Sequence, residues 1–371
     1  MKKFFALIIA FAIVLSTNTS LASEQLIEAS GEYIMDSRLD ETAASATARA
    51  REEAKRAAVE KGGVYLQSYS KMVGFVLEED EVQTVTSQLI KIQEESSNVE
   101  VIEKNLLKFT VTIKALISDL DENTLTTIMK DRQAVEELTR KNKELQEKYD
   151  ALNRQMLMYR NEFDSADAAQ KIKIKKDVAL NTEKFYAINE FSKGNDFSFR
   201  KDFTRALAAY DEAIKLDPQL AETYNNRGIV RYELGQFSAA VEDYTTAIKL
   251  KSNYADALNN RGNAYAALEQ FQNAENDFRA ALRLNDKSAA AHNNLGSLFV
   301  FKKNFNAAID ECTYAIQLNP NFAEAYYNRA LAYYAQGDYS KALNDAQKSL
   351  QLNPYDNDAR ELYNKINRQS R

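Results

Sequence analysis

Small and aromatic residues recur every 34 positions in the second half of the chain. Aligned at that period, five units begin at Ala187, Ala221, Ala255, Ala289 and Ala323 without insertions. Position 20 of every unit is Ala, position 17 is Phe or Tyr, and position 8 is Gly or Ala. Small residues let two helices cross closely, and the aromatic side chains fill the space between one helix pair and the next. The pattern predicts five stacked helix–turn–helix units.

The period and the spacing of these residues resemble the tetratricopeptide repeat over residues 187–356. The resemblance implies an α-solenoid of five repeats, with a polar helix at 357–371 that caps the last one. Members of this family bind extended peptides on a concave surface, which is lined mainly by the first helix of each repeat. The resemblance therefore implies a protein or peptide partner for this chain.

Asparagine recurs in the middle of the first helices. It occupies position 6 in repeats two to five and position 5 in three repeats, as Asn226, Asn260, Asn294 and Asn328 and as Asn225, Asn259 and Asn293. A carboxamide offers one acceptor and two donors, so such a stripe could clamp a peptide main chain. It is similar to the asparagine ladder of some tetratricopeptide proteins. The alternative is that these residues only cap or solvate the helix surfaces.

If the stripe binds a peptide, replacing the position-6 residues with Ala should weaken binding and leave thermal stability nearly unchanged. Tyr232, Phe301 and Tyr334 lie near the ends of first helices and are expected to add apolar or stacking contacts to the same partner.

Other polar positions of the repeats have a structural interpretation. Arg occupies position 7 in repeats two, three and five and is followed sixteen residues later by Asp, as in Arg227 and Asp243. This spacing predicts an ionic link between the two helices of one repeat. His292 lies at a packing position and is expected to be a core aromatic residue. Cys312 replaces an aromatic residue and is expected to be a small buried side chain.

Residues 121–165 show a heptad pattern of apolar residues and contain neither Gly nor Pro as far as 163. The pattern predicts a coiled coil or long helix, with self-association through residues 128–163, where Asn142 is a polar seam residue that could fix the register. The alternative is an antiparallel hairpin, in which this helix folds back on a connecting helix at 166–186.

Residues 23–120 predict a small α+β domain. An Ala-rich helix is expected from Leu39 to Lys61, with Gly62-Gly63 as its stop, and a second helix over 78–92. Alternating apolar and polar residues predict a strand over 107–115, with a hairpin partner at 98–103 and another strand at 64–69. The run Ala29 to Tyr33, the Ala-rich helix and residues 110–114 resemble the N-terminal domain of flagellar assembly protein T. That resemblance implies an envelope-associated module without catalytic residues.

The first residues have the pattern of a secretory signal peptide. Lys2 and Lys3 precede an apolar run over residues 4–15, and Ser20-Leu21-Ala22 places small residues before a cut after Ala22. We expect residues 1–22 to be removed and the mature protein to be exported, to the periplasm or the extracellular space. No later segment is long and apolar enough to span a membrane.

Composition argues against several classes of function. The chain of 371 residues has one His, one Cys and a net charge of −6. A single imidazole and a single thiol weigh against metal sites built from either, and the acidic charge weighs against nucleic-acid binding. We expect no catalytic residues, no metal and no cofactor. The sequence thus predicts a mainly α, exported protein-interaction scaffold. The alternative is a structural envelope protein that self-associates through its coiled coil.

Overall fold

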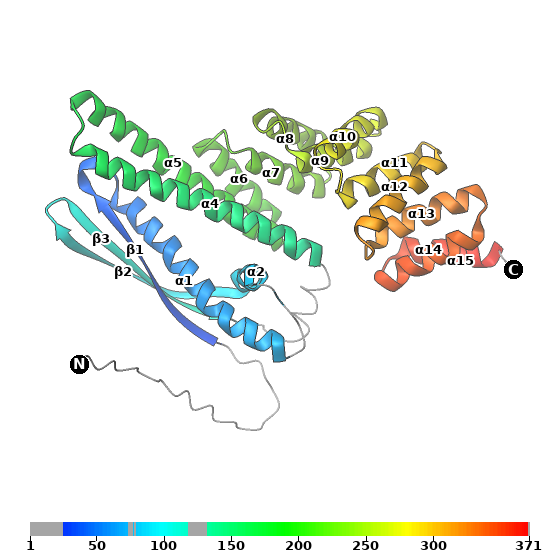
Figure 1. The fold of residues 1–371 in the computed structure, drawn as a ribbon, viewed down its shortest axis with the longest axis horizontal. Coiled ribbons are helices and arrows are strands. Elements are labelled where there is room, and N and C mark those ends of the chain that lie inside the picture. The colour runs from blue at the N-terminus through cyan, green and yellow to red at the C-terminus, as the bar shows by residue number, and fades with distance from the viewer. Residues whose placement is uncertain (1–24, 73–76, 78, 118–131, 370–371) are drawn as a thin grey trace, which may run out of the picture. The chain divides into compact units, whose positions relative to one another are not determined.

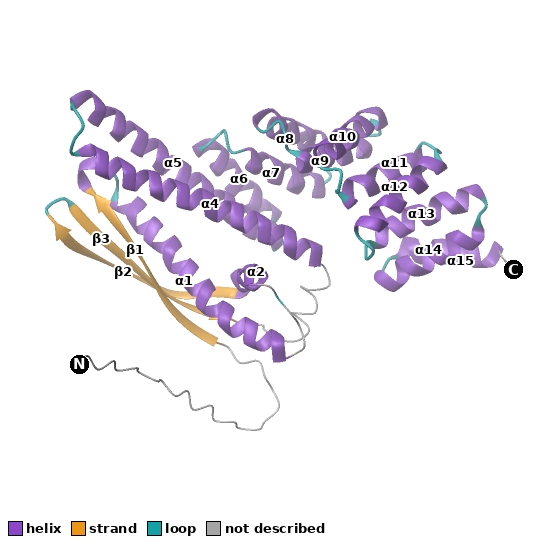
Figure 2. Cartoon of the chain, viewed as in Figure 1, coloured by secondary structure: helices purple, strands orange, loops and turns teal. Residues whose placement is uncertain are grey.

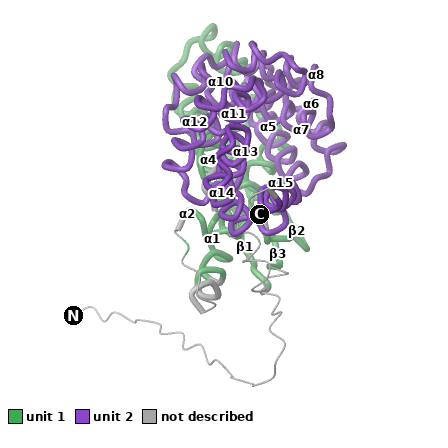
Figure 3. Tube along the Cα trace, turned by 90° about the vertical axis from the view of Figure 1, so that its right-hand side faces the viewer, with its two compact units in different colours: residues 1–182 green, residues 183–371 purple. Residues whose placement is uncertain are grey.

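The computed structural model describes residues 25–72, 77, 79–117 and 132–369, so the expected signal peptide lies outside the described residues. The chain forms two compact units, residues 1–182 and 183–371 (Figure 3). The first combines helices with a sheet, and the second is built from helices in its described residues (Figure 2). The expected class, a mainly α protein with a small N-terminal α+β part, is confirmed.

A three-stranded antiparallel sheet and one long helix form the core of the first unit. Its elements are β1 (Gln25–Asp36), a 3-10 turn (Ser37–Leu39), α1 (Ala43–Met72), α2 (Glu79–Leu89), β2 (Ile90–Glu103), β3 (Leu106–Ile117) and α4 (Arg132–Phe163), followed by α5 (Ala168–Phe199). The strand order is β1-β3-β2, and α1 lies along one face of the sheet (Figure 1). Ala46, Ala50, Ala54 and Ala58 are fully buried against it. Their small side chains let the helix approach the strands closely.

Three expectations for this unit are wrong. Gly62 and Gly63 do not stop α1, and residues 64–69 are part of this helix instead of a strand. A Cβ atom built on Gly62 would lie 2.8 Å from Thr86 Cγ2 and 2.9 Å from Ile117 Cδ1. The glycine therefore serves close packing inside the helix. The second helix is also shorter than expected, because it ends at Leu89 and the chain continues directly into β2.

The apolar seam of α4 is buried within the first unit. Met156 and Phe163 of α4 pack with Ile174 and Val178 of α5. The Asn181 amide of α5 donates to the Leu152 carbonyl of α4 at 3.1 Å. These contacts form the antiparallel hairpin, the alternative to a coiled coil that pairs two chains. The Lys-rich stretch at 171–176 is helical, and the expected connecting helix continues without a break into the first helix of repeat one.

A fully buried arginine joins three helical segments of the first unit. Arg49 of α1 is 1% exposed. Its Nη1 and Nη2 donate to the side-chain oxygens of Asn153 and Asn181, both at 2.6 Å. Its Nε lies 3.5 Å from Glu41 Oε1, and the Tyr33 hydroxyl donates to the other Glu41 oxygen at 3.3 Å. Burial raises the pKa of Glu41, although the nearby Arg49 acts in the opposite direction.

The second unit contains the repeats. After α5 follow α6 (Phe203–Leu216), α7 (Ala221–Glu233), α8 (Phe237–Leu250), α9 (Ala255–Ala267), α10 (Phe271–Leu284), α11 (Ala289–Phe301), α12 (Phe305–Leu318), α13 (Ala323–Gln336), α14 (Tyr339–Leu352) and α15 (Asn357–Gln369). Position 15 of all five repeats has a positive φ, at Lys201, Gly235, Glu269, Lys303 and Gly337. The same turn therefore joins the two helices of each repeat, and the pairs stack in sequence order (Figure 1).

Candidate functional site

The two helices of each repeat cross where the sequence places its smallest residues. A Cβ atom built on Gly262 of α9 would lie 2.6 Å from Cε1 of Phe278, the position-24 residue of α10. Ala274 and Ala281, at positions 20 and 27, are buried beside this ring. The expected close crossing of the two helices at small residues is confirmed, and the position-24 ring packs on the glycine of its own repeat. It brings successive first helices into direct contact, α7 with α9, α9 with α11 and α11 with α13.

The asparagines of the first helices bond to one another between repeats. Each position-6 amide from repeat three onward donates to the position-5 oxygen of the preceding repeat: Asn260 to Asn225 at 3.1 Å, Asn294 to Asn259 at 3.0 Å and Asn328 to Asn293 at 2.9 Å. Asn226 instead donates to Asn195 at 2.8 Å and accepts from Asn225 at 3.1 Å. The seven residues therefore lie in a row along the layer of first helices, with one bond between each pair of neighbouring repeats.

This row has a structural role that sequence reasoning missed. Asn225, Asn293 and Asn328 are buried, whereas Asn226, Asn259, Asn260 and Asn294 are half-buried. The side-chain oxygens of Asn260 and Asn294 have no partner among the described residues. Each of these two amides thus holds its neighbour through one N–H and keeps an oxygen and a second N–H for another molecule. Because the row also joins repeats, the expectation that its removal leaves stability unchanged no longer follows.

The three aromatic candidates all pair with other rings. Tyr232 packs on Phe237 with a centroid distance of 5.2 Å, and Tyr334 packs on Tyr339 at 5.6 Å. Phe301 stacks on Phe271 at 6.2 Å and is still 73% exposed. Of the three, Phe301 offers the largest apolar surface to a partner.

The expected ionic links within repeats are confirmed. Arg227, Arg261 and Arg329 each place two guanidinium nitrogens on both oxygens of an Asp, at distances between 2.6 and 3.0 Å. The remaining Nη1 of each reaches the second helix of the preceding repeat, where it bonds Asp211, Thr245 or Thr313. These arginines are therefore occupied within the solenoid and do not form a basic surface for acidic ligands.

Repeat four departs from this pattern. Leu295 replaces the arginine and is buried, and the acid at the partner position is Glu311. His292, which we expected to be a core aromatic residue, is half-buried and bonds Glu311 through Nδ1 at 2.6 Å. Cys312 is fully buried, as expected, and burial raises the pKa of its thiol to about 12. The thiol therefore stays protonated at neutral pH and is a packing group.

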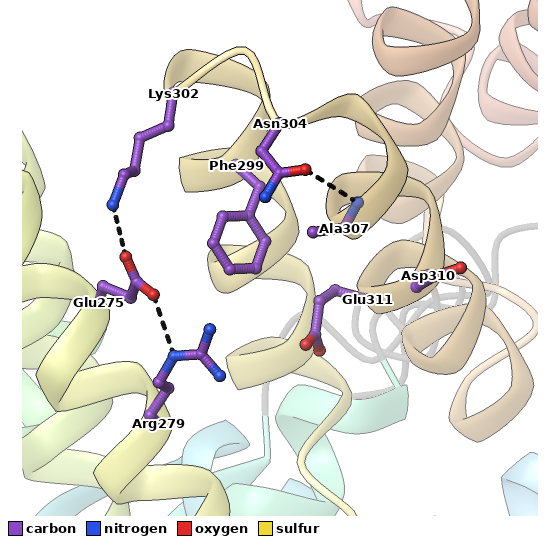
Figure 4. Close-up of a pocket in the computed structure, with 8 residues that line it drawn as sticks. All are labelled: Glu275, Arg279, Phe299, Lys302, Asn304, Ala307, Asp310 and Glu311. Atoms are coloured by element: carbon purple, nitrogen blue, oxygen red, sulfur yellow. Dashed lines mark hydrogen bonds and ion pairs between the residues drawn. The ribbon is translucent and has the colours of Figure 1, made fainter.

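A pocket of about 440 Å³ opens beside this repeat (Figure 4). It is lined by Glu275 and Arg279 of α10, Phe299 of α11, Lys302 and Asn304 of the turn, and Ala307, Asp310 and Glu311 of α12. Glu275 accepts from Arg279 at 3.0 Å and from Lys302 at 2.5 Å, and the bond from Lys302 is the main cause of its lowered pKa. The pocket is lined by charged side chains on both walls, and its two cations, Arg279 and Lys302, both bond Glu275.

Within the described residues, no cluster of three or more His, Cys, Asp or Glu side chains is arranged to hold a metal ion. None of the helices that the structure describes has the length and apolar character needed to cross a membrane.

Comparison with solved structures finds tetratricopeptide repeat proteins. A structure of the MamA protein is 26% identical, over 45% of this chain and 91% of that one, with a TM-score of 0.40. YrrB, a TPR protein with an unusual peptide-binding site, is 25% identical over 50% of this chain and 95% of its own, with a TM-score of 0.40. TTC0263, a thermophilic TPR protein from Thermus thermophilus, is 22% identical over 48% and 98%, with a TM-score of 0.43. Comparison with curated proteins finds no match.

Family models match most of the repeat region. Models described as tetratricopeptide repeat match residues 198–259, 255–288 and 323–356, and a model described as TPR repeat matches residues 297–337. The matches at 255–288 and 323–356 coincide with repeats three and five of the 34-residue register. The C-terminal part of this chain is a tetratricopeptide repeat solenoid.

Proposed function

We propose that this chain is an exported protein-interaction scaffold, which binds an extended polypeptide along the layer of first helices of its repeats. The observation that carries the proposal is the asparagine row. Asn260 and Asn294 each present an oxygen and an N–H that the described residues leave unused. An extended peptide offers the complementary groups, one N–H and one carbonyl per residue.

The chemistry of the row favours recognition of the peptide main chain. Carboxamides bond equally well to donors and acceptors and carry no charge, so they impose no requirement for acidic or basic partner side chains. Position 2 is acidic in three repeats, as in Glu222 and Asp256, so this position offers no cation that could bind a carboxylate of the partner. Phe301 adds an apolar contact at one end of a first helix, where it is 73% exposed. The partner is therefore proposed to be an extended segment with at least one large apolar side chain.

A single substitution tests the row. Asn260→Ala removes the bond to Asn225 between repeats two and three, and should lower the free energy of unfolding by about 1 kcal/mol. If the row binds peptide, the substitution should also lower the affinity for a display-selected peptide several-fold. The peptide is selected for binding to residues 23–371. Calorimetric titration measures the affinity, and urea unfolding followed by circular dichroism measures the stability.

Thr245→Val is the matched control. It removes the bond from Arg261 Nη1 to Thr245 Oγ1, at 3.1 Å, which joins the same two repeats through the second helix α8. The control should lose comparable stability and retain full peptide affinity. Equal peptide affinities for the two variants would contradict binding by the row, and failure to select any peptide would contradict the scaffold proposal itself.

Export is tested separately. We propose that the chain is cut after Ala22, on the basis of the charged start, the apolar run over residues 4–15 and the small residues before the cut. Expression of the full chain in a bacterium with an outer membrane should give a periplasmic protein whose N-terminal sequence begins at Ser23. Replacing Ala22 with a bulky residue such as Phe should leave the precursor uncut. Recovery of intact chain in the cytoplasm would contradict export.

A further inference from the structure

Repeat four lacks the permanent ionic link of its neighbours. In repeats two, three and five, a position-7 arginine holds the position-23 acid of the same repeat. In repeat four the acid is still present, as Glu311, but Leu295 occupies position 7 and is 1% exposed. In the other repeats, this arginine also bonds the residue at position 25 of the preceding repeat. Before repeat four, position 25 is a cation, Arg279. Repeat four therefore has neither the arginine nor its acceptor on the preceding repeat.

His292 makes that link, and its two bonds specify its protonation. Nδ1 lies 2.6 Å from Glu311 Oε2, and Nε2 lies 3.2 Å from the carbonyl oxygen of Asp286. A carboxylate and a carbonyl oxygen can only accept, so both ring nitrogens must donate. Neutral imidazole has one N–H, and only the imidazolium ion has two. The geometry is therefore that of a charged histidine bound to a carboxylate.

The surroundings of the ring favour this charged form. Its side chain is 14% exposed, and the ring packs edge-on against Tyr314 of α12, with centroids 4.6 Å apart. The titratable and charged groups that the structure places on the ring are Glu311 and Tyr314 from α12 and Asp286 from the loop before α11. Arg279 of α10 stands across the pocket from Glu311 (Figure 4), and Arg329 of α13 is bound to Asp345.

Two opposing effects act on the pKa of His292. Burial of the ring lowers the pKa, whereas the bonds to Glu311 and to the Asp286 carbonyl raise it. The bonds prevail, and the pKa lies above the ordinary value of 6.5. This direction agrees with the two-donor geometry.

We propose that repeat four is a pH-sensitive joint of the solenoid, in which protonated His292 replaces the permanent arginine link and joins α11 to Glu311 of α12. The protonated ring donates to both Glu311 and the Asp286 carbonyl. After deprotonation, one ring nitrogen carries a lone pair that faces an acceptor, so one of the two bonds is lost. A group whose pKa is raised on folding adds stability that is fully present below its unfolded pKa and is lost as pH rises through its folded pKa. The joint is therefore tight in mild acid and loosens as the pH rises through the raised pKa of His292, while the three arginine links stay constant.

The single histidine makes the joint directly observable. In residues 23–371, produced with a tag that contains no histidine, one imidazole gives rise to all histidine signals in a proton–nitrogen correlation NMR spectrum. Titration should show one transition with a pKa above 6.5, and both ring nitrogens should be protonated below it. Glu311→Gln should shift the transition to lower pH, because burial remains while the carboxylate is gone.

Asp310→Asn is the matched control, because it removes a neighbouring acid of α12 that does not bond the ring. It should leave the His292 transition nearly in place. A second measurement follows the urea midpoint of the parent and of His292→Tyr, which introduces the residue of repeats two and five. The parent should lose stability as the pH rises from below 6.5 through the raised pKa of His292, and the variant should lose less over the same interval.

Two results would overturn the joint. One is a His292 transition at or below 6.5, the ordinary value, that does not move in Glu311→Gln. The other is an identical pH dependence of the urea midpoint in the parent and in His292→Tyr. Neither measurement uses a peptide ligand, so the outcome is independent of the proposed function.

Discussion

Replacing Arg49 with Met should lower the free energy of unfolding of the first unit by about 3–5 kcal/mol, the range for removing one partner of a buried ion pair. The guanidinium is fully buried and supplies the donors for the Asn153 and Asn181 oxygens. Met fills much of the volume but leaves both oxygens without these donors and Glu41 without its closest cation. The hydrogen bonds from Arg49 to α4 and to α5 would be lost together.

Hydrogen exchange followed by mass spectrometry measures this loss locally. Peptides from α1 and α4 should exchange far faster in Arg49→Met, while peptides from α9 to α14 keep their protection. Arg51→Met is the control, since Arg51 lies on the same helix but is 39% exposed where it pairs with Glu95. An exposed pair contributes at most about 1 kcal/mol. Similar exchange in both variants would show that burial of Arg49 has no special role.

Replacing Gly262 with Val should destabilise the solenoid by roughly 3 kcal/mol, the upper end for an overpacked core. A single Cβ atom at this position already lies 2.6 Å from the Phe278 ring, which is 1% exposed and packed on all sides. Val adds two further carbons to the same space. The helices α9 and α10 must then separate, which also strains the bidentate bond between Arg261 and Asp277.

Ala267→Val controls for the change in residue type, because Ala267 is exposed near the end of the same helix. It should cost only a few tenths of a kcal/mol, in line with a surface helix position. Adding Phe278→Leu to Gly262→Val should recover part of the loss, since it removes the atoms that clash. The urea midpoints of the parent, of the three single variants Gly262→Val, Ala267→Val and Phe278→Leu, and of the double variant test both statements. A double variant less stable than the sum of its single changes would contradict the packing explanation.

The repeats could be predicted from sequence because their determinants are local. Position 8, on the first helix of a repeat, contacts position 24, on the second helix of the same repeat, across a short turn. The contact recurs in several repeats, so one misread residue does not alter the pattern. In repeat five both residues change together: Ala330 replaces the glycine at position 8, and Ala346 replaces the aromatic residue at position 24. The left-handed conformation at position 15 is harder to predict from sequence, because Lys201, Glu269 and Lys303 adopt it although they are not glycine.

The first unit and the polar bonds were less predictable, because they depend on contacts distant in sequence. Gly62 looked like a helix stop, and only the side chains of Ile27, Thr86 and Ile117 explain it as a packing site within α1. The asparagine row was visible as a recurrence, but its bonds join residues 35 positions apart in neighbouring repeats. The bond between His292 and Glu311 could not be predicted from His292 alone. It arises because Leu295, on the same helix, replaces the arginine that bonds the corresponding acid in other repeats.

The bonding direction of the asparagine row bears on how such a chain can evolve. Each internal repeat donates from position 6 to the repeat before it and accepts at position 5 from the repeat after it. A duplicated segment of one repeat length would therefore encode a unit whose donor and acceptor both find partners at once. Lengthening by unequal crossing-over needs no compensating mutation at these positions. A copy of repeat four would carry Leu295 and His292 with it, so the position of the duplicated segment would decide how many arginine links the longer protein has.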